Sequence, residues 1–337
     1  MKPIVFVGLG FGVALLGGCG GPQTGLDSLG ALTQPASPRL PWLAVSSKTA
    51  APDARRSWMT SDAKKGDLLY VSDDTTDDVY VFSYPQGRLV GTLTGFSAPG
   101  GPCADAHGDV FVPDVFTSTI EEFAHGGSNP IGTLSEAADA YPDKCDVNRT
   151  NGDLAVSNDG NAFGQVRGGI AIYRAATGTP SIHKAMYHPY SCGYDSDGNL
   201  FVDGEDEYFR GFQFGELPAS GKRYRKISLD QSIALPGGVV WRGNSVAVGD
   251  VYNAVIYQFA ISASNGTRVG TTTLSGTSLA WDFQLDGGKV IVPNVVQQSK
   301  GSSDILNYRY PAGGSAINAI GTGVVLNPVG VVISRAY

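Results

Sequence analysis

The sequence predicts an all-β fold, a six-bladed β-propeller with four-stranded blades whose first blade is completed by the C-terminal strand. The first observation is composition: 46 of the 337 residues are Gly and 19 are Pro, while 42% are hydrophobic, which suits strands and turns rather than helices. The second is a repeat of 41 to 46 residues. The third is a strand-like segment near the C-terminus that the first repeat lacks.

The charge pattern excludes one class of partner. Charged residues make up 16% of the chain, the formal net charge is -7, and no basic cluster is longer than Lys222 to Lys226. A surface that binds nucleic acid needs a denser basic patch. We therefore expect no nucleic-acid partner.

The N-terminus predicts export and a lipid anchor. The apolar run from Ile4 to Leu16 is too short to cross a bilayer and is typical of a secretion signal. It ends in Leu16-Gly17-Gly18-Cys19, which resembles a bacterial lipobox. That resemblance implies a lipoprotein signal peptide over residues 1–18, acylation of Cys19 and attachment to the lipid bilayer. Gly20 resembles the sorting pattern of outer-membrane lipoproteins. The alternative is an ordinary cleaved signal in which Cys19 is incidental.

Residues 19–65 are predicted to form a lipidated flexible tether. The segment is rich in Gly, Pro, Ser, Ala and Thr and has no sustained period of 2 or 3.6. Trp42 and Trp58 are exceptions, and we expect such residues to pack onto the folded domain. The propeller domain is assigned to residues 66–337.

A short apolar strand recurs six times along that domain. Its closing residues are Val71, Val112, Val156, Val202, Val248 and Val292. Five copies are followed two residues later by Asp73, Asp114, Asn158, Asp250 and Asn294. The fourth copy differs, with Asp203-Gly204-Glu205. Carboxylates and amides could bind Ca²⁺ or a polyol, but repetition in nearly every unit favours hydrogen bonds that shape each turn.

A second strand follows each copy and ends on an aromatic residue, which predicts a large side chain between stacked sheets. A Pro-led inner strand precedes most units, at Pro99, Pro142, Pro189, Pro236 and Pro328. The segment that begins at Pro328 has no later unit to serve, and the unit that begins at Gly66 has no inner strand. We therefore expect the C-terminal strand to close the ring, which also removes the edges an open solenoid would expose.

The repeats also carry a family resemblance. The segment from Asp195 to Val202 resembles an NHL-type repeat, and residues 66–337 are similar to the six-bladed superfamily of NHL proteins, gluconolactonase-type enzymes and streptogramin lyases. Tyr70-Val71-Ser72-Asp73 and Tyr84-Pro85-Gln86-Gly87 resemble signatures of uncharacterised bacterial propeller lipoproteins more closely. That group brings no known activity.

The enzyme families in this superfamily imply a divalent metal at the central channel. At the positions after the recurrent Pro, only Asp143 could be a ligand; the others are Gly100, Tyr190, Gly237 and Val329. The His and Glu of the lyases have no counterpart in a Glu-x-His context. Calcium or another divalent metal therefore stays open as a cofactor, without support from the family motif.

Candidate ligand-binding residues lie where the repeat is broken. His188 and Tyr190 flank Pro189 at the predicted channel rim, and Asp203 and Glu205 belong to the irregular fourth unit, so these four join Asp143 as candidates. No nucleophile is fixed near His188 by spacing, so no catalytic residue is assigned. Several aromatic residues could line the channel: Tyr187, Tyr190, Tyr194, Trp241 and Trp281.

Three cysteines fall in predicted inner strands of consecutive blades. Cys145 and Cys192 occupy equivalent positions, whereas Cys103 is offset by one residue. In an oxidising envelope a disulfide between Cys145 and Cys192 is the pairing considered, with Cys103 free; three buried thiols are the alternative.

These observations favour a non-catalytic module, anchored to the cell envelope, that binds a small molecule or a protein. The alternative is a metal-dependent lactonase or lyase with a rearranged site.

Overall fold

The computed structural model describes residues 56–160, 167–221, 223–296 and 301–337. They belong to the compact unit that spans residues 39–337. The predicted signal peptide, Cys19, Trp42 and most of the predicted tether lie outside the described residues. Among the residues described, no helix has the length and apolar character needed to cross a bilayer.

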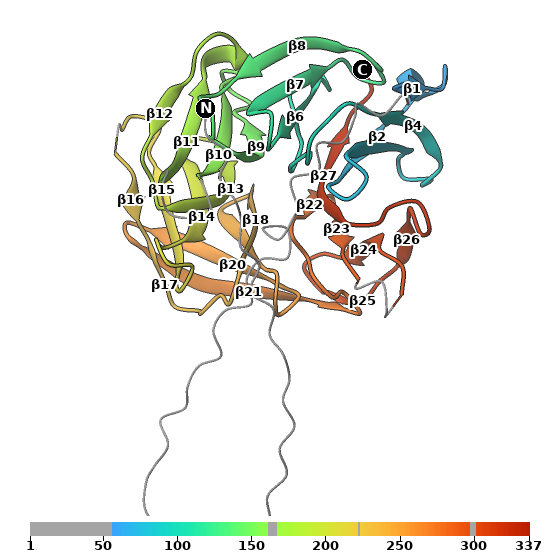
Figure 1. The fold of residues 1–337 in the computed structure, drawn as a ribbon. Helices are drawn as coiled ribbons and strands as arrows, with labels where there is room; N and C mark the ends of the chain where they lie inside the picture. Colours follow the sequence, from blue (N-terminus) through green and yellow to red (C-terminus); the bar gives the residue numbers. More distant parts are fainter. Residues whose placement is uncertain (1–55, 161–166, 222, 297–300) are drawn as a thin grey trace, which may run out of the picture. The chain divides into compact units, whose positions relative to one another are not determined.

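Six β-sheets follow one another around a central axis (Figure 1). From the axis outward, the strands of blade 1 are β27 (Pro328–Ser334), β2 (Leu68–Asp73), β3 (Asp78–Ser83), β4 (Leu89–Leu93) and β1 (Trp58–Met59). Those of blade 2 are β5 (Cys103–Ala104), β6 (Val110–Asp114), β7 (Thr119–Phe123) and β8 (Pro130–Ser135). Those of blade 3 are β9 (Pro142–Val147), β10 (Leu154–Gly160), β11 (Arg167–Tyr173) and β12 (Ser181–His183).

The other three blades repeat this order. The strands of blade 4 are β13 (His188–Tyr194), β14 (Leu200–Glu205), β15 (Phe212–Leu217) and β16 (Arg225–Lys226). Blade 5 is built on β18 (Pro236–Arg242), β19 (Ser245–Asp250), β20 (Val255–Ser262) and β21 (Asn265–Ser275), with β17 (Ser228–Leu229) and β25 (Gly314–Ser315) beside β21. Those of blade 6 are β22 (Gln284–Asp286), β23 (Lys289–Asn294), β24 (Asp304–Arg309) and β26 (Asn318–Ile320). Two short 3-10 turns complete the described elements, η2 (Ala63–Lys65) and η3 (Arg174–Ala176).

The C-terminal strand closes the ring as the sequence predicted. β27 pairs antiparallel with β2 over its length, with Tyr70 opposite Val332. This confirms the six-bladed propeller with a first blade completed from the C-terminus. Blade 1 gains one further strand, because Trp58 pairs with Thr92 and the Met59 side chain packs against the core. The sheet therefore includes residues that the sequence analysis placed in the tether.

The repeated apolar strand lies fully buried because its two faces pack against different neighbours. In β2, Leu68 and Tyr70 belong to the core shared with blade 2, while Leu69 and Val71 belong to the core shared with blade 6. Alternation along a strand explains this division, since successive side chains point to opposite faces. The third strand of each blade, counted from the axis, carries the predicted closing aromatic residue. All six of these residues are buried: Phe82, Phe123, Tyr173, Phe214, Phe259 and Tyr308.

Candidate functional site

Blade 4 departs from the repeat where β14 ends. The position that holds Asp or Asn in the other blades is Gly204. A Cβ at Gly204 would lie 2.0 Å from the carbonyl oxygen of His188, and its φ is +158°. Glycine therefore lets the start of β13 approach β14 closely, and this approach sets His188 opposite Glu205 in the register.

His188 and Asp159 form a buried pair across the boundary between blades 3 and 4. Nδ1 of His188 lies 3.1 Å from Oδ1 of Asp159 and 3.1 Å from its backbone oxygen. Both partners are acceptors, so Nδ1 carries the proton and donates it. Burial lowers the pKa of His188, but the hydrogen bond and charge of Asp159 outweigh it and raise that pKa above its usual value. Burial also raises the pKa of Asp159.

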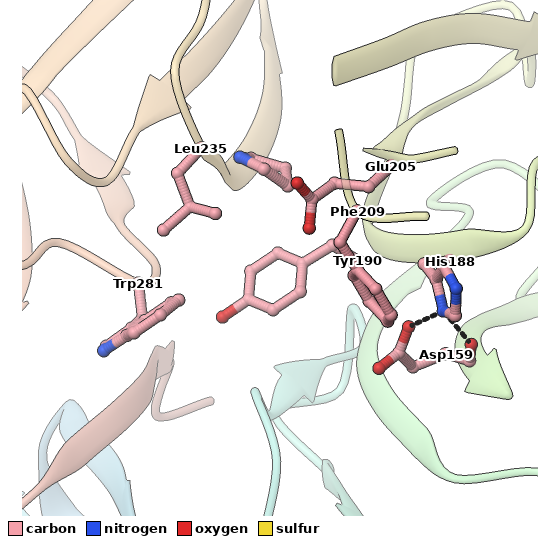
Figure 2. A pocket seen from close by; sticks show the side chains of 8 residues that line it. Asp159, His188, Tyr190, Glu205, Phe209, Leu235 and Trp281 are labelled. Atoms are coloured by element: carbon pink, nitrogen blue, oxygen red, sulfur yellow. Dashed lines mark hydrogen bonds and ion pairs between the residues drawn. The ribbon is translucent and has the colours of Figure 1, made fainter. Parts of the chain in front are cut away.

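This pair lines a small cavity near the axis (Figure 2). The cavity has a volume of about 10 Å³, which is room for about one water molecule. Aromatic rings form much of its wall: Phe209 stacks on His188 with centroids 3.8 Å apart, and the Tyr190 and Trp281 centroids are 6.0 Å apart. The complete lining is Asp159, His188, Tyr190, Glu205, Phe209, Leu235, Pro236 and Trp281.

Glu205 brings a second carboxyl group to this cavity. Its side chain is 7% exposed, and it makes no hydrogen bond or ion pair within the described part of the chain. Burial, together with the charge of Asp159, raises the pKa of Glu205 to about 7, while His188 opposes this shift. A buried carboxyl of this kind is costly to ionise unless a positive charge accompanies it.

Tyr190 lies between the cavity and a cluster of charged groups near the axis, in which Lys144 is buried and Asp143 and Asp282 are half-buried. The ammonium of Lys144 lies 5.0 Å from the centroid of the Tyr190 ring and donates a hydrogen bond to the carbonyl of Val329, 3.1 Å away. Burial raises the pKa of Asp143 to about 6, with Lys144 opposing. Burial also raises the pKa of Asp282, again with Lys144 opposing. Lys144 is therefore the cation that accompanies these acids at the centre of the ring.

A much larger channel occupies the axis on the other side of Lys144. Its volume is about 850 Å³, and all six inner strands contribute to its wall. Exposed side chains at its mouth, such as Arg149 and Arg242, show that it reaches solvent at the end where the inner strands turn back. No residue lines both spaces. The channel and the cavity are therefore two separate compartments.

The five candidate residues from the sequence do not all line one space. His188, Tyr190 and Glu205 line the cavity, whereas Asp143 and Asp203 do not. The carboxylate of Asp203 accepts the backbone N–H of Ser191 at 3.0 Å, which fixes β13 against β14. Among the aromatic candidates, Trp281 lines the cavity, and Tyr194 and Trp241 line the channel.

The repeated Asp and Asn residues hold the segments that lead into the inner strands. Asp114 accepts the N–H of Ser97, Asp250 accepts that of Ala234, and Asn294 accepts that of Ser278. Asp73 accepts N–H groups from the corresponding segment of blade 1 and from its own turn. The predicted bond to the backbone of the turn is present at Asp73 and Asp250, whereas the side chains of Asp114 and Asn294 bond the segment before the inner strand instead. Within the described residues, no group of three or more His, Cys, Asp or Glu is arranged to hold a metal ion.

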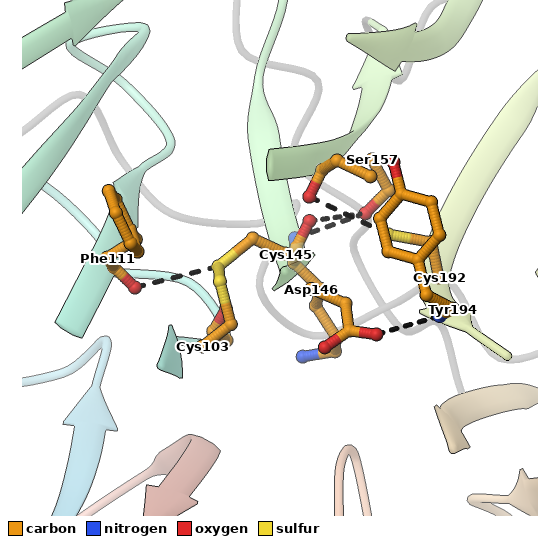
Figure 3. The surroundings of a disulfide bond; sticks show 10 residues. Cys103, Phe111, Cys145, Asp146, Ser157, Cys192 and Tyr194 are labelled. Carbon is orange, nitrogen blue, oxygen red and sulfur yellow. Dashed lines mark hydrogen bonds between the residues drawn. A yellow bond between two sulfur atoms is a disulfide. The ribbon is translucent and has the colours of Figure 1, made fainter. Parts of the chain in front are cut away.

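The disulfide in the structure differs from the pairing of Cys145 with Cys192 that was considered from the sequence. Cys103 is bonded to Cys145, with Cα atoms 5.5 Å apart, and Cys192 is a buried free thiol (Figure 3). The register gives the reason. Cys145 pairs with Val156 and Cys192 with Val202, so these two cysteines are equivalent and both point back toward the preceding blade. The one-residue offset of Cys103 points it forward, where it meets Cys145.

Three residues of the two compartments were missed by sequence reasoning. Asp159 directly follows Asn158 of the repeat, and Lys144 is a charged residue in a predicted inner strand. An acid next to the repeated position and a charge in an otherwise buried strand are both departures from the repeat, and either could have marked these residues as candidates. Phe209 lies in a loop with a left-handed backbone, at φ 53°, and carries no pattern that predicts its stacking on His188.

The comparisons with known proteins support the fold. A chain in a crystal structure of a nidogen/laminin complex is similar with a TM-score of 0.64 and 11% identity, over 80% of this chain and 99% of that chain. A Bacteroides caccae protein of unknown function matches with a TM-score of 0.62 and 11% identity over the same shares. No family model and no curated protein matches. At this identity the likeness shows the six-bladed propeller alone.

Proposed function

We propose that this chain is a non-catalytic binding protein of the cell envelope whose axial channel takes a small polar molecule. The observation that carries the proposal is the channel itself. A volume of about 850 Å³ falls in the range of small-molecule sites. The nidogen chain comes from a structure that is itself a complex with laminin, so the same architecture serves binding in another protein.

The channel wall offers groups of both charges and flat apolar surface. Arg242 at the mouth lies over the ring of Tyr310, with 5.8 Å from its guanidinium carbon to the centroid, and neither it nor Arg149 forms an ion pair within the described residues. Trp241 and Tyr194 add aromatic area. A polar molecule with an anionic group and a flat face, such as a sugar acid, fits this combination.

The arrangement of possible catalytic groups favours binding over turnover. The acid–base pair of His188 and Asp159 faces a cavity with room for about one water, not the channel. The free thiol in the channel wall is Cys192, and burial raises its pKa well above the usual value, so it is protonated and a weak nucleophile.

The test is a thermal-stability screen of polar metabolites with the wild type and with Ala106→Trp. Ala106 is exposed and lines the channel, so Trp should fill the mouth and weaken binding at least tenfold. Ala138→Trp, on an exposed residue outside the channel, should bind normally. A bound compound should be recovered unchanged. Turnover of a lactone or ester with Ca²⁺, Mg²⁺ or Zn²⁺ that is abolished by His188→Ala would instead establish the metal-dependent enzyme.

The envelope location is part of the proposal and rests on Cys19 and the apolar run before it. Expression of the full chain in a diderm bacterium with a labelled fatty acid should label the wild type, and the protein should fractionate with the outer membrane. Cys19→Ser should carry no label. A labelled Cys19→Ser protein, or an unlabelled wild type, would remove the lipid anchor.

A further inference from the structure

The wall of the cavity beside His188 combines aromatic rings with carboxyl groups. The rings of Tyr190, Phe209 and Trp281 present π surfaces, and Asp159 and Glu205 bring two carboxyl groups. Figure 2 shows the Glu205 carboxylate pointing among these side chains, with the Tyr190 ring beneath it in the view. Aromatic faces and a carboxylate around one point attract a cation.

Of the charged side chains that line the cavity, Glu205 alone has no ion-pair partner among the described residues. Asp159 already accepts from the Nδ1–H of His188, so their charges offset each other when the imidazole is protonated. Glu205 is 7% exposed and has no partner within the described residues. The cation that would complete the cavity therefore belongs at the Glu205 carboxylate.

The size of the cavity restricts what that cation can be. A volume of about 10 Å³ takes a group no larger than a water molecule, and an –NH₃⁺ head group has this size. Two of the lining side chains, Phe209 and Leu235, are partly exposed. The remaining lining residues are buried. A ligand would therefore enter past Phe209 and Leu235.

We propose that this cavity binds a primary ammonium head group, which donates hydrogen bonds to the Glu205 carboxylate and lies between the rings of Tyr190, Phe209 and Trp281. The site is separate from the channel and does not depend on the function proposed for it. Ammonium fits the cavity as it stands, and the ammonium group of methylammonium fits when its methyl group points toward the entrance at Phe209 and Leu235. Tetramethylammonium does not, because it cannot donate a hydrogen bond and exceeds the available space.

The experiment follows the unfolding midpoint of the protein at pH 8 in the chloride salts of ammonium, methylammonium, potassium and tetramethylammonium. Sodium chloride at matched ionic strength is the reference. A dissociation constant of about 5 mM would raise the midpoint by about 2 °C at 50 mM ligand. We expect this rise with ammonium and methylammonium and a smaller one with potassium, which cannot donate. Tetramethylammonium should give none.

Three variants separate binding from general stability. Glu205→Gln should weaken ammonium binding at least tenfold, whereas Glu207→Gln, an exposed acid in the adjoining loop, should leave it unchanged. Phe209→Ala should enlarge the entrance and admit tetramethylammonium. Calorimetric titration of each folded variant gives the dissociation constant even where its midpoint has moved.

Several results would overturn the proposal. A midpoint that responds equally to all four salts would show a general ionic effect, and a midpoint that responds to none would leave a cavity for water only. Equal binding to wild type and Glu205→Gln would place the cation elsewhere. We expect Ala106→Trp, which fills the mouth of the channel, to bind ammonium as the wild type does. Loss of ammonium binding in this variant would place the cation in the channel.

Discussion

The boundary between blades 2 and 3 and the boundary between blades 3 and 4 use the same strand positions in different ways. At the first, Cys103 and Cys145 form a disulfide within an apolar cluster. At the second, Cys192 stands in the place of Cys145 but has no disulfide partner, because the position equivalent to Cys103 is Asp146.

Polar contacts replace the covalent link at the second boundary. The carboxylate of Asp146 accepts the N–H of Tyr194 at 2.7 Å, the hydroxyl of Ser157 donates to the carbonyl of Tyr190 at 2.8 Å, and Asp159 accepts from His188. The His188–Asp159 pair of this boundary forms part of the cavity wall. Both boundaries keep an apolar cluster, so the difference lies in what is added to it: a covalent bond at the first boundary and buried polar groups at the second.

Removal of the disulfide should have the largest effect on stability. Cys145→Ser opens a bond that spans 42 residues of sequence, and the chain-entropy model gives a loss of about 4 kcal/mol in the free energy of unfolding. Cys192→Ser is the matched control, since it alters the equivalent buried position without a bond, and it should cost about 1 kcal/mol. Urea unfolding measures both. Equal losses would mean that the two boundaries do not differ in this respect.

The polar boundary should respond to pH through Glu205. The pKa of this group rises from 4.5 when unfolded to about 7 when folded, so between these values the folded state holds the extra proton. Stability therefore falls as pH rises through this window and is flat above it. The contribution is roughly 3 kcal/mol, and Glu205→Gln should remove it.

Unfolding free energies from pH 4 to 9 measure this effect. The variant should match the wild type near pH 4 and exceed it near pH 8. Glu207→Gln should retain the wild-type slope. A wild type whose slope survives in Glu205→Gln would assign the pH response to another group.

The smallest expected effect comes from making the second boundary resemble the first. Asp146→Cys places a thiol where Cys103 lies in blade 2, facing Cys192, so a second disulfide should form under oxidising conditions. The net gain should be only about 1 kcal/mol, because the bond from Tyr194 is lost and engineered disulfides seldom reach their full entropy. Mass spectrometry of non-reduced peptides detects the link, with Asp146→Ser as control. Failure to link would show that the two boundaries differ in backbone spacing as well as in residue type.

The architecture could be predicted from the sequence because each blade buries the same strand in the same way. The same period of 41 to 46 residues separates the repeated valines. It also relates the closing aromatic residues to one another and identifies the segment after Pro328 as an inner strand, so a single sequence is enough to show it. The two-residue strand Trp58–Met59 escaped because it is too short to show any period. Its position depends on pairing with β4, which lies far along the chain.

The site was only partly predictable, because its geometry depends on contacts between blades. The irregular Asp203-Gly204-Glu205 lies in a blade that lines the cavity, and His188, Tyr190 and Glu205 all belong to the cavity wall. Phe209 reaches the cavity only through a loop conformation. For the cysteines, equivalence in the repeat suggested proximity, but equivalent side chains on neighbouring blades point in the same direction around the ring and do not meet.

Closure by β27 also bears on the order in which the molecule can fold. Blades 2 to 6 take their inner strands from residues just before the rest of each sheet, but the inner strand of blade 1 is Pro328–Ser334. Until that strand pairs, β2 offers an unpaired apolar edge to other chains. A chain truncated before Pro328 should therefore leave blade 1 without its inner strand and should aggregate.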